Sequence, residues 1–130
     1  GVELVITGNE QEGEVISEAS EKLGIPVRKI TGATDLRTLA AVLSLSKLVV
    51  ANSTGPLHLA VSVHTTGIGL YPSRKAMSPL RWGPLGKSDR VIQPVGVECT
   101  CPPGQCTCME IIKPEQVLDE VLDVLGRKKK

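Results

Sequence analysis

The stretch Val49–Ala60, VVANSTGPLHLA, decides the fold of this chain because an apolar run stops at small polar residues and an apolar helix pattern follows at once. The apolar run predicts a strand over residues 47–51, and the pattern beyond the glycine and proline predicts a helix over residues 57–63. A strand followed directly by a helix is the repeating unit of α/β proteins with a mostly parallel sheet. This stretch therefore predicts the fold class, and the same unit should recur elsewhere in the chain.

The strand-to-helix unit does recur. Turn residues follow each apolar run, and apolar residues then repeat at helical spacing, as for Ile16, Ala19 and Leu23. We expect one α/β domain over residues 1–126, with a Rossmann-like, mostly parallel sheet and flanking helices, and a basic tail over residues 127–130. The expected elements are strand 2–7, helix 9–23, strand 25–30, helix 36–43, strand 47–51, helix 57–63, strand 67–71, an irregular segment 72–89, strand 90–93 and helix 114–125.

Composition argues against several classes of function. The chain has 130 residues, of which 41% are hydrophobic and 22% charged, with a formal net charge of +1. A near-neutral charge and two aromatic residues, Tyr71 and Trp82, provide neither a basic surface nor a stacking platform for nucleic acid. No apolar segment approaches the length of a membrane span. We therefore expect no nucleic-acid partner and no membrane-spanning helix.

The turn after the third expected strand predicts an anion site. Free N–H groups, the positive end of the helix dipole and the hydroxyls of Ser53 and Thr54 should converge at the start of the helix. Gly55 lets a ligand approach the backbone, and Pro56 suits the first helical turn. His58 follows within that turn and could donate a hydrogen bond to an anionic oxygen. The alternative is an ordinary helix cap beside a buried histidine that bonds to backbone, and local physics does not separate the two.

Further candidates follow neighbouring strands. The carboxylate of Glu12 could accept ribose hydroxyls, or it could simply complement the dipole of the first helix. Thr34 and Asp35 could contact a ligand or cap the next helix. Arg81 belongs to a segment that could form a basic lip over an anionic ligand or remain a solvated loop. The sequence contains no glycine-rich dinucleotide fingerprint and no Walker loop.

The four cysteines form two C-x-C pairs within ten residues, at Cys99, Cys101, Cys106 and Cys108. Such a cluster can stay reduced and packed, form disulfides, or hold Zn²⁺ through four thiolates, although C-x-C is less typical of zinc than C-x-x-C. A catalytic thiol has the least support, because the sequence places no base beside it. The sequence leaves the reduced, disulfide-bonded and zinc-bound states open, and no metal is expected to be required.

Residues 34–86, TDLRTLAAVLSLSKLVVANSTGPLHLAVSVHTTGIGLYPSRKAMSPLRWGPLG, resemble the C-terminal domain of family-nine glycosyltransferases, the ADP-heptose:lipopolysaccharide heptosyltransferases. The shared pattern is a Leu-x-x-Leu-Ala helix, an apolar strand, NSTGPLHLA, another strand and Arg-Trp-Gly-Pro. The resemblance extends over nearly the whole chain. It implies one half of a two-domain transferase, in which this half binds a nucleotide-diphosphate sugar of the ADP-heptose type. It also implies inverting transfer, without a required cofactor, to the lipopolysaccharide core by a bacterial enzyme in the cytoplasm or at the inner face of the inner membrane.

The resemblance also implies residue roles. The loop Thr54-Gly55-Pro56 and His58 would hold the diphosphate and the sugar, with His58 stabilising the leaving group. Glu12 matches the family's ribose-binding glutamate, Thr34 lies where the family's loop meets the base, and Arg81 would face the diphosphate or the acceptor. These roles define the substrate-binding set expected for this chain.

Two departures from the family pattern matter. Ser53 stands where members close to the characterised heptosyltransferases carry an aspartate that contacts the sugar, which leaves the donor sugar open. The acceptor domain with its catalytic base has no counterpart here, nor has the first strand of the donor domain. We therefore expect a fragment that does not catalyse transfer alone and whose sheet closes directly, exchanges a strand with a second copy as a homo-oligomer, or keeps open edges. The alternative function is a non-catalytic α/β module for nucleotide binding or assembly.

Overall fold

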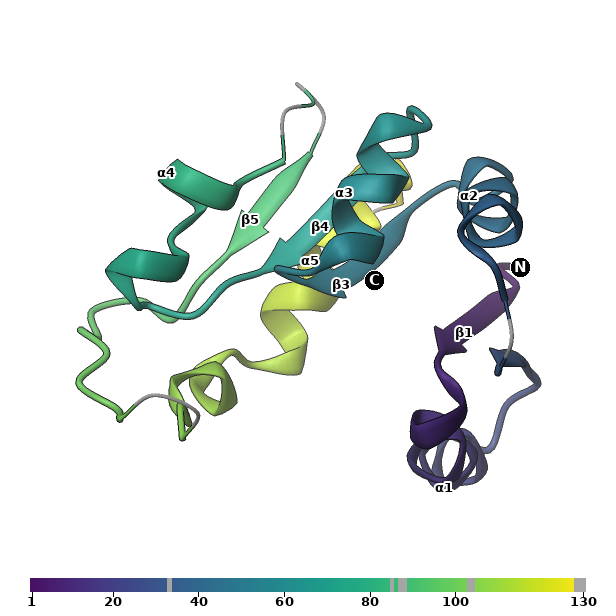
Figure 1. Cartoon of the computed structure of the whole chain (residues 1–130), viewed down its shortest axis with the longest axis horizontal. Coiled ribbons are helices and arrows are strands. Elements are labelled where there is room, and N and C mark those ends of the chain that lie inside the picture. The colour runs from purple at the N-terminus through teal and green to yellow at the C-terminus, as the bar shows by residue number, and fades with distance from the viewer. Residues whose placement is uncertain (33, 85, 87–88, 103–104, 128–130) are drawn as a thin grey trace. The chain divides into compact units, whose positions relative to one another are not determined.

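A computed structural model describes the chain except for residues 33, 85, 87, 88, 103, 104 and 128–130. The chain divides into two compact units, Gly1–Leu39 and Ala40–Lys130, and each unit contains its own parallel sheet (Figure 1). The strands alternate with helices in chain order. This arrangement confirms the predicted α/β class with a mostly parallel sheet and flanking helices.

The first unit pairs two strands, β1 (Leu4–Gly8) and β2 (Val27–Thr31), in parallel. Between them run the 3₁₀ turn η1 (Glu10–Glu12) and the helix α1 (Gly13–Leu23). Strand β2 starts two residues later than predicted, because Pro26 has no N–H to donate to the ladder.

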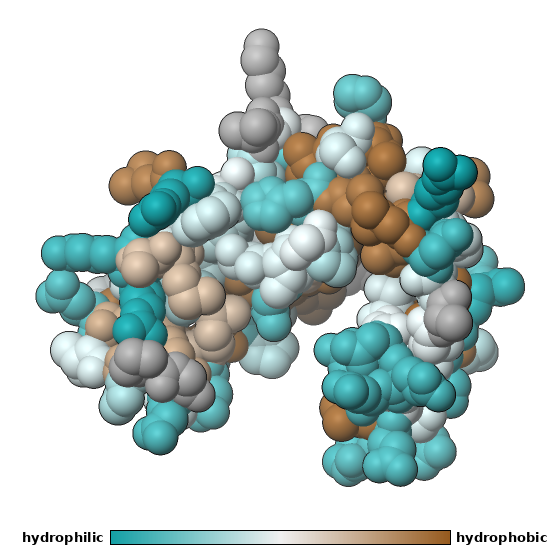
Figure 2. All heavy atoms as spheres, viewed as in Figure 1, coloured by the Kyte–Doolittle hydropathy of each residue, from teal (hydrophilic) through white to brown (hydrophobic). Residues whose placement is uncertain are grey.

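Local signals set the ends of α1. Gly24 adopts the left-handed conformation that ends a helix, with φ of 62°. Ile16 is buried on α1, and a side chain on Gly8 would collide with it, so the helix packs closely on the end of β1. The outer face of α1 is hydrophilic, as Figure 2 shows.

The second unit contains three parallel strands in the order β3 (Val49–Asn52), β4 (Gly67–Leu70) and β5 (Arg90–Ile92). Val49 lies opposite Gly67, and Ile68 lies opposite Arg90. Because all three strands run the same way, their carboxyl ends lie along one edge of this sheet. The loops that follow β3 and β4 therefore meet at that edge.

Helices cover both faces of the second sheet. In Figure 1, α3 (Gly55–Ser62) lies in front of the strands and α5 (Pro114–Val124) lies behind them. Arg90 on β5 pairs with Glu120 and Asp123 of α5 at 3.4 Å each, and these partly exposed ion pairs fix the helix direction more than they stabilise the fold. The remaining helix, α2 (Leu36–Ser44), spans the boundary between the two units.

The segment between β4 and β5 differs from the prediction of an irregular stretch. It contains the 3₁₀ turn η2 (Lys75–Met77) and the short helix α4 (Pro79–Trp82). Pro79 supplies a favourable first helical position, and the N–H of Gly83 donates to the Pro79 carbonyl at 2.7 Å. The prolines and glycines of this segment exclude long elements but not single turns.

Two hydrogen-bonded sheets stand where the sequence predicted one sheet that lacks a strand. The first sheet lies within the unit Gly1–Leu39 and the second within the unit Ala40–Lys130. None of the described helices is long and apolar enough to cross a membrane.

Candidate functional site

The centre of the candidate site is the start of α3, directly after β3. Thr54 takes the extended conformation of an N-cap residue, with φ of −139° and ψ of 172°, and a proline follows in the first turn as predicted. The Thr54 carbonyl accepts the N–H of Leu57 at 3.1 Å. The turn thus begins a helix at the edge of the sheet where ligands bind in open α/β proteins.

The Thr54 side chain does not cap this helix. Its hydroxyl instead donates to the carbonyl of Asn52, the last residue of β3, at 3.1 Å. The first N–H groups of an α-helix have no partner within the helix, and here no described side chain replaces one as a cap. A Cβ at Gly55 would meet nothing within 4 Å, so the space beside this backbone is open. Open space and uncapped donors are what an anionic ligand needs.

Leu57 sets how closely the first turn of α3 approaches the sheet. Its side chain is fully buried and lies against two glycines of β4. A Cβ at Gly67 would stand 2.8 Å from Leu57 Cδ1, and a Cβ at Gly69 would stand 2.7 Å from Leu57 Cδ2. The two glycines let the first turn of α3 approach the sheet more closely than any other residue type would allow.

His58 is exposed on the first turn of α3, and the described residues offer its imidazole no hydrogen bond or ion pair. The alternative of a buried histidine that bonds to backbone therefore does not apply. The chain's other histidine, His64, follows the far end of the same helix and has a left-handed backbone, with φ of 64°. The two histidines thus mark opposite ends of α3.

Tyr71 connects the two loops at the edge of the second sheet. It follows β4, is fully buried, and its hydroxyl donates to the Trp82 carbonyl at 2.7 Å. The Ser53 side chain hydrogen-bonds the same phenol, while the Ser53 N–H donates to the Leu70 carbonyl at 3.0 Å. Burial raises the pKa of Tyr71, so the phenol stays protonated and able to donate.

Arg81 lies beside this connection. It is exposed on α4, and its guanidinium stands 5.6 Å from the centre of the Trp82 ring. Trp82 is half exposed, and its indole N–H donates to the Ala76 carbonyl at 3.1 Å. The structure thus joins Ser53 through Tyr71 to the segment that carries Arg81.

Glu12 and Thr34 belong to the first unit. The Glu12 carboxylate accepts the Asn9 N–H at 2.8 Å through Oε2, and the Asn9 side chain accepts the Glu12 N–H at 3.0 Å. This capping box gives Glu12 a local role that uses one of its two carboxylate oxygens. The Thr34 N–H donates to the Gly32 carbonyl at 2.7 Å, and the cap of α2 comes from Asp35.

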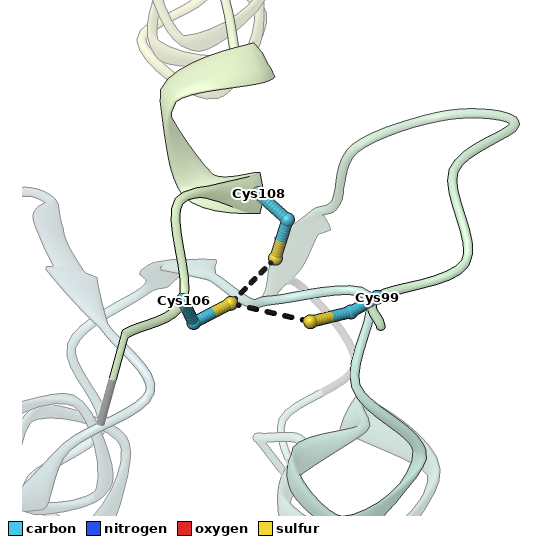
Figure 3. Close-up of side chains that lie close together, drawn as sticks. All are labelled: Cys99, Cys106 and Cys108. Carbon is cyan, nitrogen blue, oxygen red and sulfur yellow. Dashed lines mark hydrogen bonds between the residues drawn. The ribbon is translucent and has the colours of Figure 1, made fainter. Parts of the chain in front are cut away.

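Three of the four cysteines converge. Cys106 Sγ lies 2.9 Å from Cys108 Sγ and 3.4 Å from Cys99 Sγ (Figure 3). The thiol of Cys101 interacts with those of Cys99 and Cys106, and the Thr107 N–H lowers its pKa by hydrogen bonding. The neighbouring Cys108 thiol raises the pKa of Cys106. All four of these described cysteines are free thiols.

Sequence reasoning did not identify Tyr71 as a residue that organises the site. The available signal was its position directly after a buried strand, in a chain with one other aromatic residue. An aromatic ring with a polar tip at that place can be buried while its hydroxyl links two loops. The hydrogen bonds themselves are non-local and left no pattern in the sequence.

An open parallel sheet with an uncapped helix start at its carboxyl edge is the arrangement at which many α/β proteins bind nucleotides or phosphate. The family model for glycosyltransferase family 9 (heptosyltransferase) matches residues 1–108. The chain belongs to this family, which confirms the resemblance found in its sequence.

Similar proteins come from several bacteria. The chain is 32% identical over 82 residues to the lipopolysaccharide core heptosyltransferase OpsX of Haemophilus influenzae, covering 63% of this chain and 23% of that protein. It is 24% identical over 129 residues to the lipooligosaccharide heptosyltransferase 2 of Campylobacter jejuni, covering 94% and 40%. The chain therefore spans less than half the length of these relatives.

Solved structures show the same fold. A glycosyltransferase of family 9 from Veillonella parvula superposes with a TM-score of 0.80 at 20% identity, over 97% of this chain and 37% of that one. The ADP-heptose LPS heptosyltransferase II of E. coli gives 0.78 at 24% identity over the same shares. These matches confirm the predicted fold class.

Proposed function

We propose that this chain forms the donor-binding part of a glycosyltransferase that moves heptose from a nucleotide diphosphate donor, of the ADP-heptose type, to the lipopolysaccharide core. The observation that carries the proposal is the start of α3, where uncapped N–H groups face open space beside Gly55. A helix start of this kind attracts a diphosphate through its N–H groups and its dipole. Membership of the heptosyltransferase family supports the choice of sugar and acceptor.

The proposed roles follow from position. The backbone of Thr54–Pro56 holds the diphosphate, and the exposed His58 donates to it from the same turn. Ser53 faces the sugar, and Arg81 adds a positive charge from α4. In the first unit, Glu12 binds the ribose hydroxyls through the carboxylate oxygen that takes no part in the capping box, and Thr34 contacts the base.

The proposed chemistry is direct displacement at the anomeric carbon, with inversion. Charge builds up on the departing nucleotide diphosphate, and the helix start with His58 stabilises that charge, so the step requires no cofactor. The acceptor and the base that activates it lie outside these 130 residues, in the remainder of a two-domain enzyme. The chain alone therefore binds donor and does not transfer sugar. We place the enzyme in the cytoplasm, at the inner face of the inner membrane.

Gly55→Ala tests the close approach of the ligand. The added methyl meets no protein atom within 4 Å, and alanine favours helix, so the variant should fold at least as well as the wild type. The same methyl occupies the space of the diphosphate and should weaken binding of ADP or ADP-heptose about tenfold or more, measured by calorimetry. Unchanged affinity in a folded Gly55→Ala variant refutes the proposed site.

The two histidines provide an internal control. Titration with ADP should shift the imidazole signals of His58 in the NMR spectrum and leave those of His64 in place. His58→Ala should weaken ADP binding by about 10- to 100-fold, the value of a hydrogen bond to a charged group, and His64→Asn should not. Sulfate at equal ionic strength should not reproduce the His58 shift. Equal shifts at both histidines, or equal response to sulfate, contradict a donor site.

A further inference from the structure

The loop between β5 and the 3₁₀ turn η3 (Cys108–Ile111) holds three of the chain's four cysteines, and the fourth, Cys108, begins η3. Among its described residues none belongs to a helix or strand, and Cys108 is buried. A connection of this length whose described residues form no helix or strand is uncommon in a compact protein unless further contacts hold it together. The apolar side chains of this loop are too few to do so, since Val95 and Val97 are exposed.

The sulfur atoms of this loop point toward one place. Figure 3 shows Cys99 reaching from one arm of the loop toward Cys106 and Cys108 on the other. The Sγ atoms of these three residues all lie within 4.8 Å of one another. Cys101 lies two residues after Cys99 on the same arm, outside this cluster of three. The cluster therefore joins one C-x-C pair to a sulfur of the other.

The arrangement of the sulfurs, more than any single distance, favours a metal over a disulfide. Four thiolates at about 2.3 Å from a tetrahedral Zn²⁺ stand about 3.8 Å apart, and the Cys99–Cys106 distance of 3.4 Å is close to this value. The Cys106–Cys108 distance of 2.9 Å lies midway between this value and the S–S bond of about 2.05 Å in a disulfide. A disulfide between two of the three converging sulfurs would leave the third without a partner in the cluster. Cys106 is instead close to two partners at once, which is the arrangement of ligands around a shared centre.

Cys99, Cys101 and Cys106 are partly exposed, so an ion can enter from solvent.

We propose that the clustered Cys99, Cys106 and Cys108 hold one structural Zn²⁺, with Cys101 of the same loop as the fourth thiolate, and that this site fixes the loop between β5 and η3. Each thiol gives up its proton to solvent as it binds, and no oxidation occurs. The ion links the two arms of the loop. It acts like a covalent cross-link, which stabilises the folded state because it restricts the conformations of the unfolded chain. This site is separate from the donor site proposed above and does not depend on it.

The experiment measures metal in the full 130-residue chain, purified under reducing, oxygen-free conditions. Elemental analysis after gel filtration should give about one zinc ion per chain, and added Co²⁺ should produce the charge-transfer and visible bands of a tetrahedral thiolate site. Reaction of the four thiols with a mercurial should release the zinc to a colorimetric chelator. A reduced, folded chain that takes up neither ion overturns the proposal.

Variants test the ligand set. Cys99→Ser/Cys106→Ser should lose both the bound zinc and the cobalt bands, while Thr100→Ala, in the same loop, should keep them. Because Cys108 is buried, its replacement could unfold the chain, so the partly exposed pair is chosen and folding is followed by circular dichroism. Zinc retained by a folded double-serine variant contradicts the proposal, and so does a chain that contains a Cys99–Cys106 disulfide and no zinc when purified without reductant.

Discussion

Replacing Gly69 by alanine tests the packing that positions the start of α3. The new Cβ would lie 2.5 Å from Tyr71 Cε2 and 2.7 Å from Leu57 Cδ2, whereas carbon atoms pack at about 3.5–4.0 Å. Both side chains are fully buried, and Tyr71 is held by its hydrogen bond to Trp82, so each must shift by about 1 Å against a packed core. Overpacking a core costs about 1–3 kcal/mol. Because both neighbours are held in place, we expect Gly69→Ala to lower the free energy of unfolding by about 3 kcal/mol.

Urea unfolding followed by the fluorescence of Trp82, the sole tryptophan, measures this cost in the second unit. With a slope of about 1.5 kcal/mol per molar, the midpoint of Gly69→Ala should fall by about 2 M. Gly55→Ala is the matched control, because its methyl meets nothing within 4 Å, and its midpoint should stay or rise slightly. Equal midpoints for the wild type and Gly69→Ala refute the close approach of α3 to the sheet.

A double-mutant cycle identifies Leu57 as the neighbour involved. Leu57→Ala alone should cost about 2–5 kcal/mol, since it empties a fully buried site. In the Gly69→Ala background the added methyl partly fills that space, and the double variant should be about 1 kcal/mol more stable than the sum of the single effects predicts. Strict additivity would show that Leu57 and Gly69 do not touch.

Three further predictions follow from single residues. His64→Gly should raise stability by about 1 kcal/mol, seen as a higher melting temperature, because glycine adopts the left-handed φ of 64° without strain; no gain would contradict that backbone. Burial raises the pKa of Tyr71 above its unfolded pKa of about 10. The contribution of the neutral phenol to stability is therefore fully present below pH 10 and is lost as the pH rises through the folded pKa. The urea midpoint of Tyr71→Phe should not show this loss at alkaline pH. The hydrogen bond from the Thr38 N–H lowers the pKa of Asp35 below its unfolded value. The carboxylate therefore stabilises α2 above about pH 4, and this stabilisation is lost as the pH falls through the folded pKa. Circular dichroism of Asp35→Asn should show no such loss of helicity.

The sequence predicted those elements whose signals are local. The cap of η1 at Asn9, the stop of α1 at Gly24 and the proline that opens α3 each act within one helical turn, so a short stretch of sequence is enough to indicate them. The prediction of an irregular segment before β5 was wrong for α4, because a single turn begun by Pro79 needs no periodicity to be stable.

Contacts between distant residues could not be predicted. The pairing of Leu57 with the glycines of β4 and the bond from Tyr71 to Trp82 depend on how elements pack, and neither leaves a periodic trace. The same holds for the sulfurs: two C-x-C pairs are visible in the sequence, but the convergence of Cys99 on Cys106 is a property of the folded loop. Sequence reasoning therefore placed the candidate residues around α3 at the carboxyl edge of the sheet and left their partners open.

One helical turn serves both the core and the candidate site. Leu57 and Ala60 are fully buried on the sheet side of α3, whereas Gly55 and His58 are exposed at its start. Residues three apart lie on the same face of a helix. The residues that anchor α3 to the sheet and the residues that face a ligand therefore alternate within its first two turns. A change at β4 that lifts Leu57 must therefore also displace the N–H groups beside Gly55. Stability of the sheet and binding of a diphosphate should fall together in Gly69→Ala, and separate in Gly55→Ala.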